Sequence, residues 1–214
     1  MKKKIAGTAL AAALLLSACS FGASAGDKLA DAVGSIQEQE KPFHEAQEEM
    51  AGLEKKEFDL FNSMMELTKD DADKLSEMAG EAESSADERL DLLDKGDKSI
   101  EEAEKKMSDL DSAESDDEQI KKAVGQLKEA MEARYAARED YSALYKETAD
   151  LQKKLYGMLT QEDADFKEIQ DQADAVNAKN AEVRTALAHF NEATEQVNEA
   201  KTKAFDLIDS KEEE

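Results

Sequence analysis

Several residue types that other classes of protein depend on are scarce in this sequence. The 214 residues include one cysteine, one proline (Pro42), nine glycines and no tryptophan, and aromatic residues make up 5% of the chain. A single cysteine excludes a disulfide framework and a cysteine-based zinc site. So few glycines and prolines disfavour a chain built of turns and strands, such as a β-sandwich. These scarcities favour an all-α protein.

Basic residues are also few compared with acidic ones. The chain has 52 acidic and 28 basic side chains, which gives a formal net charge of −24. Nucleic acid and bare anionic membrane are polyanions, so this charge disfavours both as partners. A hydrophobic content of 40%, much of it alanine, suits thin helical seams better than a thick globular core.

The first nineteen residues indicate export. Three lysines at positions 2–4 precede a run of small and apolar residues over 5–16, which is too short to span a bilayer at about 20 residues. The run ends in Leu16-Ser17-Ala18-Cys19, which resembles the lipobox of bacterial lipoproteins. That resemblance implies a signal peptide over 1–18 and a diacylglyceryl group on Cys19. Removal of 1–18 would remove three lysines and lower the net charge from −24 to −27.

Ordinary secretion is the alternative interpretation of the same segment. Ala23-Ser24-Ala25 is an A-x-A cleavage site that would release a soluble protein beginning at Gly26. Lipidation is favoured because the only cysteine lies at the end of the apolar run. Two acyl chains on Cys19 would anchor the protein firmly, at about 0.8 kcal/mol per buried methylene.

The rest of the chain predicts long helices. Residues 19–41 are expected to form a lipidated N-terminus and a partly helical tether, 42–211 a single bundle domain, and 212–214 an acidic tail. Helix-start patterns occur at Thr68, Ser115 and Thr160, each with an acidic residue three positions on. Helices of about 40 residues extend about 60 Å. Short connections make neighbours antiparallel, so we expect an elongated up-down-up-down bundle of three to four helices with coiled-coil-like packing.

Apolar residues at steps of three and four define the expected core faces. The seam that begins at Phe43 has one polar member, Glu57. The most regular seam belongs to the last helix and comprises Phe166, Ile169, Ala173, Val176, Asn180, Val183, Leu187, Phe190, Val197, Ala204 and Ile208.

These features together resemble the YkyA-type cell-wall-binding lipoproteins of Gram-positive bacteria. The resemblance covers the lipobox Leu16 to Cys19, the length, the acidic charge and the helical heptad pattern. It implies an exported helical bundle held by lipid on the outer face of the cell membrane, and it assigns a role to one residue, Cys19. No LysM or bacterial SH3 wall-binding module is present in the sequence.

No pattern of catalytic residues emerges, so we expect a protein that is not an enzyme and holds no cofactor or metal. His44-Glu45 lacks the second histidine of a zinc-protease motif, and neither His44 nor His189 has a glutamate three positions before it, as di-iron bundles require.

The region 114–159 offers a candidate binding patch. It is nearly neutral, and it holds all four tyrosines and two of the four arginines, a composition typical of binding surfaces. The tyrosines Tyr141 and Tyr145 also lie in the seam, where they could simply fill the core. The candidate ligand or partner patch comprises Arg89, Arg134, Tyr135, Arg138, Tyr141 and Arg184.

Folding the helices back on one another places the four arginines within a little over one turn. Arg138 would then face position 89, and Arg184 would face position 135. Guanidinium groups inside a seam require carboxylate partners or an anionic ligand. Two interpretations stay open: a polar layer paired with Glu45, Glu48, Asp91 or Glu182 that fixes helix register, or a ligand site.

Three functional hypotheses follow. The first is a lipid-anchored surface protein without catalytic activity that binds peptidoglycan or another envelope protein; direct binding to anionic teichoic acids would require bridging divalent cations. The second is a coiled-coil scaffold that forms homo-oligomers. The third is an accessory factor in cell-wall turnover, which would need a cleft with a perturbed carboxylate pair.

Overall fold

The structure is a computed structural model that describes residues 24–113, 116–161, 163 and 165–212. These residues form four long helices: α1 (Ala25–Met65), α2 (Ala72–Lys105), α3 (Glu118–Leu159) and α4 (Phe166–Glu212). Two 3₁₀ segments, η1 (Lys69–Asp71) and η2 (Lys106–Ala113), lie at either end of α2. No strand occurs in the described part of the chain, which confirms the predicted all-α class.

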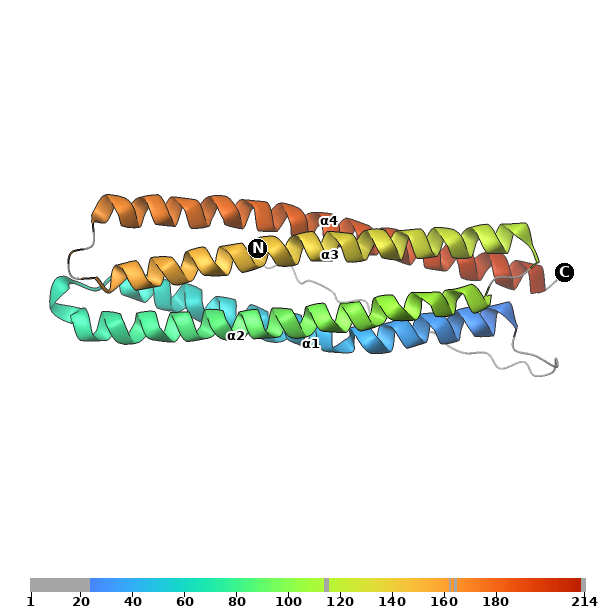
Figure 1. The fold of residues 1–214 in the computed structure, drawn as a ribbon, viewed down its shortest axis with the longest axis horizontal. Helices are drawn as coiled ribbons and strands as arrows, with labels where there is room; N and C mark the ends of the chain where they lie inside the picture. Colours follow the sequence, from blue (N-terminus) through green and yellow to red (C-terminus); the bar gives the residue numbers. More distant parts are fainter. Residues whose placement is uncertain (1–23, 114–115, 162, 164, 213–214) are drawn as a thin grey trace, which may run out of the picture.

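The helices form two hairpins packed side by side into a rod (Figure 1). One hairpin pairs α1 with α2 and the other pairs α3 with α4, and α2 contacts α3 between them. Direct contact between α1 and α4 is slight. We call the end where α1 begins and α4 finishes the near end, and the end with Met65 and Phe166 the far end. The up-down-up-down order follows the prediction.

Helix α1 begins earlier than the sequence indicated. The Ser24 hydroxyl accepts a hydrogen bond from the Asp27 N–H, and the Asp27 carboxylate accepts one from the Ser24 N–H, so a capping box starts the helix at Ala25. Pro42 lies inside α1. The predicted boundary at 42 between tether and bundle is therefore wrong, because Leu29, Val33 and Ile36 are buried in the core. The buried residues span Leu29 to Ile208, so a chain starting at Ser20 keeps every described contact.

The other helix starts agree with the sequence to different degrees. At Thr68 the prediction is confirmed, since the Asp71 carboxylate accepts from the Thr68 N–H at 3.0 Å and from its hydroxyl at 2.8 Å. Ser115 lies outside the described residues, and Asp117 caps α3 by accepting from Gln119 and Ile120. The start predicted at Thr160 is wrong: Thr160 closes α3, and its hydroxyl donates to the Gly157 carbonyl.

The core is a series of apolar clusters separated by polar layers. The largest cluster fills the near end around Leu29, Leu110 and Ile208. A second, with Met50 and Leu93, lies in the middle, and a small third one around Met64 lies toward the far end. Buried arginines occupy the two intervals between these clusters.

The predicted seam of α4 is buried in only part of its length. Between 186 and 208, α4 buries Ala186, Phe190, Ala193, Val197, Ala204 and Ile208, whereas between 166 and 185 it buries Gln172 and Val176. Phe166, the first predicted seam residue, is 76% exposed. Because α1 scarcely contacts α4, the first half of this apolar face is left uncovered. None of the described helices combines the length and the apolar content that a membrane span requires.

Candidate functional site

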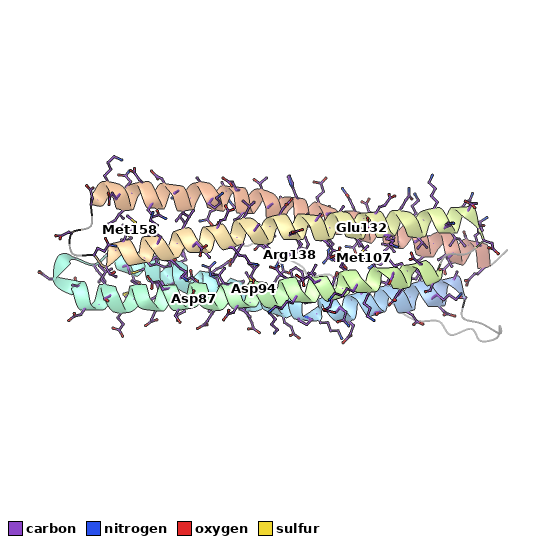
Figure 2. The ribbon with its side chains drawn as sticks, in the orientation of Figure 1. Asp87, Asp94, Met107, Glu132, Arg138 and Met158 are labelled. Atoms are coloured by element: carbon purple, nitrogen blue, oxygen red, sulfur yellow. The ribbon has the colours of Figure 1, made fainter. Side chains whose placement is uncertain are left out.

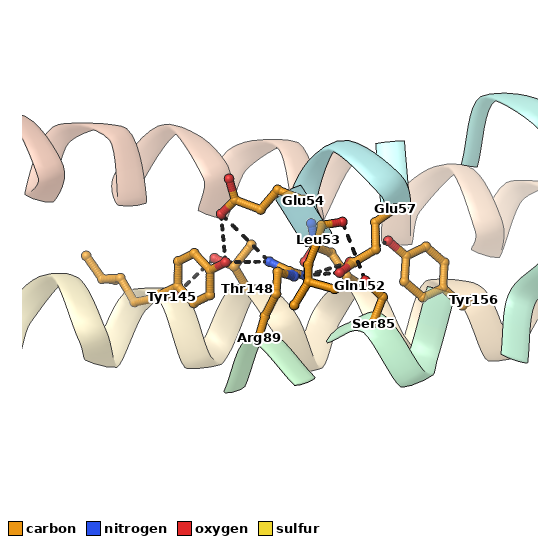
Figure 3. Close-up of polar contacts among 10 residues, drawn as sticks. Leu53, Glu54, Glu57, Ser85, Arg89, Tyr145, Thr148, Gln152 and Tyr156 are labelled. Carbon is orange, nitrogen blue, oxygen red and sulfur yellow. Dashed lines mark hydrogen bonds and ion pairs between the residues drawn. The ribbon is translucent and has the colours of Figure 1, made fainter. Parts of the chain in front are cut away.

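Arg89 is the centre of the polar layer toward the far end (Figure 3). Its Nε donates to Glu57 Oε1 at 2.5 Å and its Nη2 to Glu57 Oε2 at 2.6 Å, which is a bidentate pair between α2 and α1. Nη1 donates to the Tyr145 hydroxyl at 2.7 Å, and Nη2 also donates to Gln152 on α3. Both charged side chains are 4% exposed. The polar break that Glu57 makes in the α1 seam is thus explained by its partner.

The electrostatics of this layer keep the arginine charged and the tyrosine neutral. Burial acts to lower the pKa of Arg89, but Tyr145 and Glu57 outweigh it, so the pKa is raised. Burial raises the pKa of the Tyr145 hydroxyl, which donates to Glu54 at 2.7 Å. The layer is therefore a satisfied network that ties α1, α2 and α3 together.

The interval between the near-end and middle clusters holds the other two buried arginines. Arg134 Nη1 donates to Glu40 Oε1 at 2.6 Å, and Arg134 Nε donates to the Thr194 hydroxyl at 3.1 Å. The Tyr135 hydroxyl donates to the same Glu40 oxygen at 2.9 Å. Burial, followed by the charge of Glu40, raises the pKa of Tyr135.

Arg138 lies one turn further along α3, near the middle of the rod between α3 and α2 (Figure 2). Its Nη2 is 3.0 Å from Asp97 Oδ1, and its guanidinium carbon lies 5.0 Å from the centre of the Phe43 ring and 5.1 Å from that of Tyr141. Within the described structure its Nε and Nη1 are buried without a hydrogen-bond partner. Burial lowers the pKa of Arg138, and the two aromatic faces partly compensate for the lost hydration.

The predicted helix register, which placed the four arginines at one level along the bundle, is wrong. Tyr145, and not Arg138, lies against Arg89, and the partners are Glu57, Glu40 and Asp97 in place of the carboxylates expected from sequence. Two features shift α3 along the rod. Each 3₁₀ residue of η2 rises about 2.0 Å against 1.5 Å in an α-helix, and α3 begins at Glu118. The polar layer interpretation is nevertheless the one that fits Arg89, Arg134 and Arg138.

A groove opens between α1 and α4 in the half of the rod toward the far end. Its volume is about 550 Å³, and α3 forms its floor. Apolar side chains of α1 and α4 form the walls, among them Phe58, Phe61, Val176 and Val183. Polar side chains from α1, α3 and α4 face the same space. We call this hollow the α1/α4 groove; the residues that line it and matter most below are Phe58, Tyr141, Gln152, Asn177, Asn180 and Arg184.

Two groups in this groove lack partners among the residues that the structure describes. Arg184 is exposed and forms no ion pair or hydrogen bond there, and the Tyr141 hydroxyl forms no hydrogen bond. Burial, followed by the charge of Glu54, raises the pKa of Tyr141 to about 12, so the hydroxyl remains a donor at neutral pH. By contrast, Arg89 also lines the groove but is saturated by Glu57, Tyr145 and Gln152.

The predicted patch is thus divided among three places. Arg89, Tyr141 and Arg184 line the α1/α4 groove. Tyr135 and Arg138 line a second hollow of about 620 Å³ between α2 and α3, where five carboxylates also gather: Asp97, Glu101, Glu104, Glu132 and Glu139. Arg134 is buried against Glu40. No group of three or more potential ligands in the described residues could hold a metal ion.

Sequence reasoning missed the amides of the groove. Gln152 was not singled out, and Asn177 lies outside the predicted seam of α4. Asn180 was counted in that seam, and a polar residue in an otherwise regular apolar face was the signal that could have marked it. The predictions for residues 1–18 and Cys19 fall outside the described residues.

Known proteins resemble this chain in sequence and in fold. Residues 24–206 match the YkyA family, described as "Putative cell-wall binding lipoprotein". A protein named "Uncharacterized lipoprotein YkyA" from Bacillus subtilis (strain 168) is 32% identical over 205 residues, which cover 94% of this chain and 90% of that protein.

A solved structure shares the fold. It is the crystal structure of a conserved protein of unknown function from Staphylococcus aureus, with a TM-score of 0.72 and 22% identity, covering 82% of this chain and 88% of that one. The family match over most of the described residues and the identity to the Bacillus subtilis lipoprotein establish that the chain belongs to the YkyA family.

Proposed function

We propose that this protein is a lipid-anchored envelope protein without catalytic activity that binds the cell wall through the α1/α4 groove. The family description supports the class of function and an extracytoplasmic location. The lipobox-like sequence Leu16 to Cys19 supports Cys19 as the anchor. One observation carries the choice of site: Arg184 and the Tyr141 hydroxyl, which have no partner among the described residues, face a hollow with apolar side chains in its walls. Ligand sites commonly combine apolar walls with a few convergent polar groups.

The position of the groove fits this role. Because α1 begins at Ala25, an anchor at Cys19 would hold the near end of the rod at the membrane. The groove starts at Glu54 on α1, about 45 Å further along the helix at 1.5 Å per residue. The rod would therefore present its groove well away from the lipid surface, toward the wall.

The charged groups of the groove support binding in preference to catalysis. Glu54 and Glu57 are engaged with Arg89 and Tyr145, which leaves Arg184 as the unpaired charge among the described residues that line it. A guanidinium neither gains nor loses a proton near neutral pH, so it serves to bind an anionic group and not to transfer protons.

Co-sedimentation with purified cell walls tests the proposal. Protein starting at Ser20 is mixed with whole wall or with teichoic-acid-free peptidoglycan, each with and without Mg²⁺. We expect binding to bare peptidoglycan without Mg²⁺. Protein that is folded by circular dichroism and stays in the supernatant in every arm would contradict the proposal.

A second candidate function, a self-associating scaffold, is favoured by the large exposed apolar side chains toward the far end. Met65 is 59% exposed and Phe166 is 76% exposed. Sedimentation equilibrium distinguishes the two functions: a scaffold would form oligomers that Phe166→Ser weakens, whereas a wall-binding protein needs no oligomer.

A further inference from the structure

From the geometry of the α1/α4 groove we infer its ligand class: a short peptide with a free carboxylate, as in the peptide stems that branch from the glycan strands of the wall. This inference rests on the proposed function and names what the groove recognises. It depends on three features: the Arg184 guanidinium, which has no partner among the described residues, the row of amides beside it, and the local charge of the groove.

The Arg184 guanidinium indicates that the ligand carries a carboxylate. Arg184 is exposed at the groove and has no partner among the described residues. In Arg89, by contrast, each of the three guanidinium nitrogens donates a hydrogen bond within the polar layer. A guanidinium binds a carboxylate through two parallel hydrogen bonds. A neutral sugar would leave this group without a counter-charge, so the glycan strand alone does not use the feature that distinguishes the groove.

A row of amides on α4 points to a peptide. Asn177, Asn180 and Arg184 are spaced by three and four residues, which places them on one face of α4 over about 10 Å. Neither asparagine side chain forms a hydrogen bond within the described part of the chain. An asparagine amide both donates and accepts, as a peptide group does, so the row can pair with successive peptide groups of an extended chain that ends at Arg184.

The opposite side of the groove accommodates small apolar groups. Phe58 of α1 is 65% exposed and Phe61 lies beside it in the wall of the groove. From the floor, the Tyr141 hydroxyl can donate a further hydrogen bond. Methyl side chains of a peptide could pack against the two phenylalanine rings while the backbone faces α4.

Charge limits the ligand to one with few negative groups. The charged side chains that line the groove are two glutamates and two arginines, Glu54, Glu57, Arg89 and Arg184, so the groove is locally neutral in a chain of net charge −24. A polyphosphate chain would bring many negative charges close to the acidic surface around the groove, and would be repelled. A single carboxylate can reach Arg184 without that repulsion.

Isothermal titration calorimetry with defined wall fragments tests the inference. The protein starting at Ser20 is titrated with three ligands. They are a disaccharide peptide released by muramidase, the same fragment amidated at the carboxylate that ends its peptide, and the disaccharide lacking peptide. We expect binding of the free peptide, at least tenfold weaker binding after amidation, and no binding of the disaccharide alone.

Variants locate the contact. Arg184→Gln should weaken binding of the free peptide at least tenfold without changing the affinity for the amidated peptide, and Arg184→Lys should give an intermediate loss because it keeps charge but not the bidentate geometry. Lys154→Gln is the control, since Lys154 is also an exposed cation on the rod but does not line the groove.

Equal affinity for free and amidated peptide, or binding of the disaccharide alone, would overturn the inference. Binding to peptidoglycan with no binding of the peptide fragment would also overturn it while leaving the proposed function in place. Loss of all binding to peptidoglycan would refute the proposed function itself.

Discussion

Glu57 and Arg89 show what a buried ion pair does in a narrow bundle. Taking both charges out of water is costly, and the bidentate contact offsets this cost only while both partners are present. We expect Glu57→Ala to lower the free energy of unfolding by about 3–5 kcal/mol, because it leaves the guanidinium buried without its carboxylate. Urea denaturation followed by circular dichroism measures the change.

The double variant Glu57→Leu with Arg89→Met serves as the control for this prediction. It removes both charges at once, so the free energy of unfolding should recover to within about 1 kcal/mol of the parent protein. Glu49→Ala, at an exposed position of α1, should change it by less than about 0.5 kcal/mol. A Glu57→Ala protein as stable as the parent would contradict the account of this layer.

The buried tyrosines limit the folding stability of the bundle at alkaline pH. Burial raises the pKa of Tyr141 to about 12, above the value of about 10 expected for an unfolded chain. The folded state thus holds the Tyr141 hydroxyl proton more tightly than the unfolded chain does. The contribution to stability is complete below about pH 10, and it is lost as the pH rises toward 12.

Unfolding in urea between pH 9 and 11.5 tests the sign of this effect. The free energy of unfolding should fall with rising pH, and more gradually in Tyr141→Phe, which has one buried hydroxyl fewer. A pH-independent free energy in the parent protein across this range would show that the tyrosines are not held neutral by burial.

The sequence could predict that the buried arginines pair with carboxylates, but it could not predict which carboxylate pairs with which arginine. The sequence indicated that buried arginines would need carboxylates, and the structure supplies one for each of Arg89, Arg134 and Arg138. Which carboxylate pairs with which arginine depends on helix register across a turn. For Arg134 and Arg138 on α3, the 3₁₀ rise of η2 and the start of α3 at Glu118 set that register, and neither is encoded by heptad spacing.

At the scale of whole elements, α4 is divided into a well-packed half and a loosely packed half. Residues 186–208 bury six side chains, and residues 166–185 bury only Gln172 and Val176. We expect backbone amides of residues 170–182 to exchange with deuterium faster than those of residues 190–204, because few buried contacts oppose local opening there. Mass spectrometry of peptic fragments measures this, and equal protection of both halves would contradict it.

The α1/α4 groove exists because only one half of α4 is well packed. Spacing along α4 predicted one continuous core face, and its first half does carry the predicted apolar residues. That half instead lines a groove, since α1 packs on α2 and scarcely contacts α4. Periodicity reports which face of a helix is apolar; it does not report whether another helix covers that face.

Pro42 is a second feature that the sequence could not place fully. It stands at the predicted start of the bundle domain, whereas in the structure it lies inside α1. Proline lacks the N–H that would bond to the carbonyl four residues earlier, and in a helix interior it costs about 3 kcal/mol. Pro42→Ala should therefore raise the free energy of unfolding by up to about 3 kcal/mol in urea denaturation. A destabilised Pro42→Ala protein would show that the packing of α1 needs the proline.

At the scale of the whole molecule, the two halves of the rod differ in packing and in surface. The near end contains the largest apolar cluster. There the Gly26 N–H of α1 donates to Glu212 at the end of α4, and Lys211 of α4 forms an ion pair with Asp117, which caps α3. The groove lies in the other half, and the polar layer around Arg89 forms part of its lining. The acidic surface disfavours polyanions, and under the proposed function the locally neutral groove is where the ligand binds.

Blocking the groove tests the central claim most directly. In Asn177→Trp an indole at an exposed position would occupy the α1/α4 groove, and in Ala143→Trp the same side chain would occupy the hollow between α2 and α3. Both proteins are compared with the parent in co-sedimentation with teichoic-acid-free peptidoglycan. We predict that Asn177→Trp loses most of its binding while Ala143→Trp retains it. Undiminished binding by a folded Asn177→Trp protein would contradict the assignment of the wall-binding site to this groove.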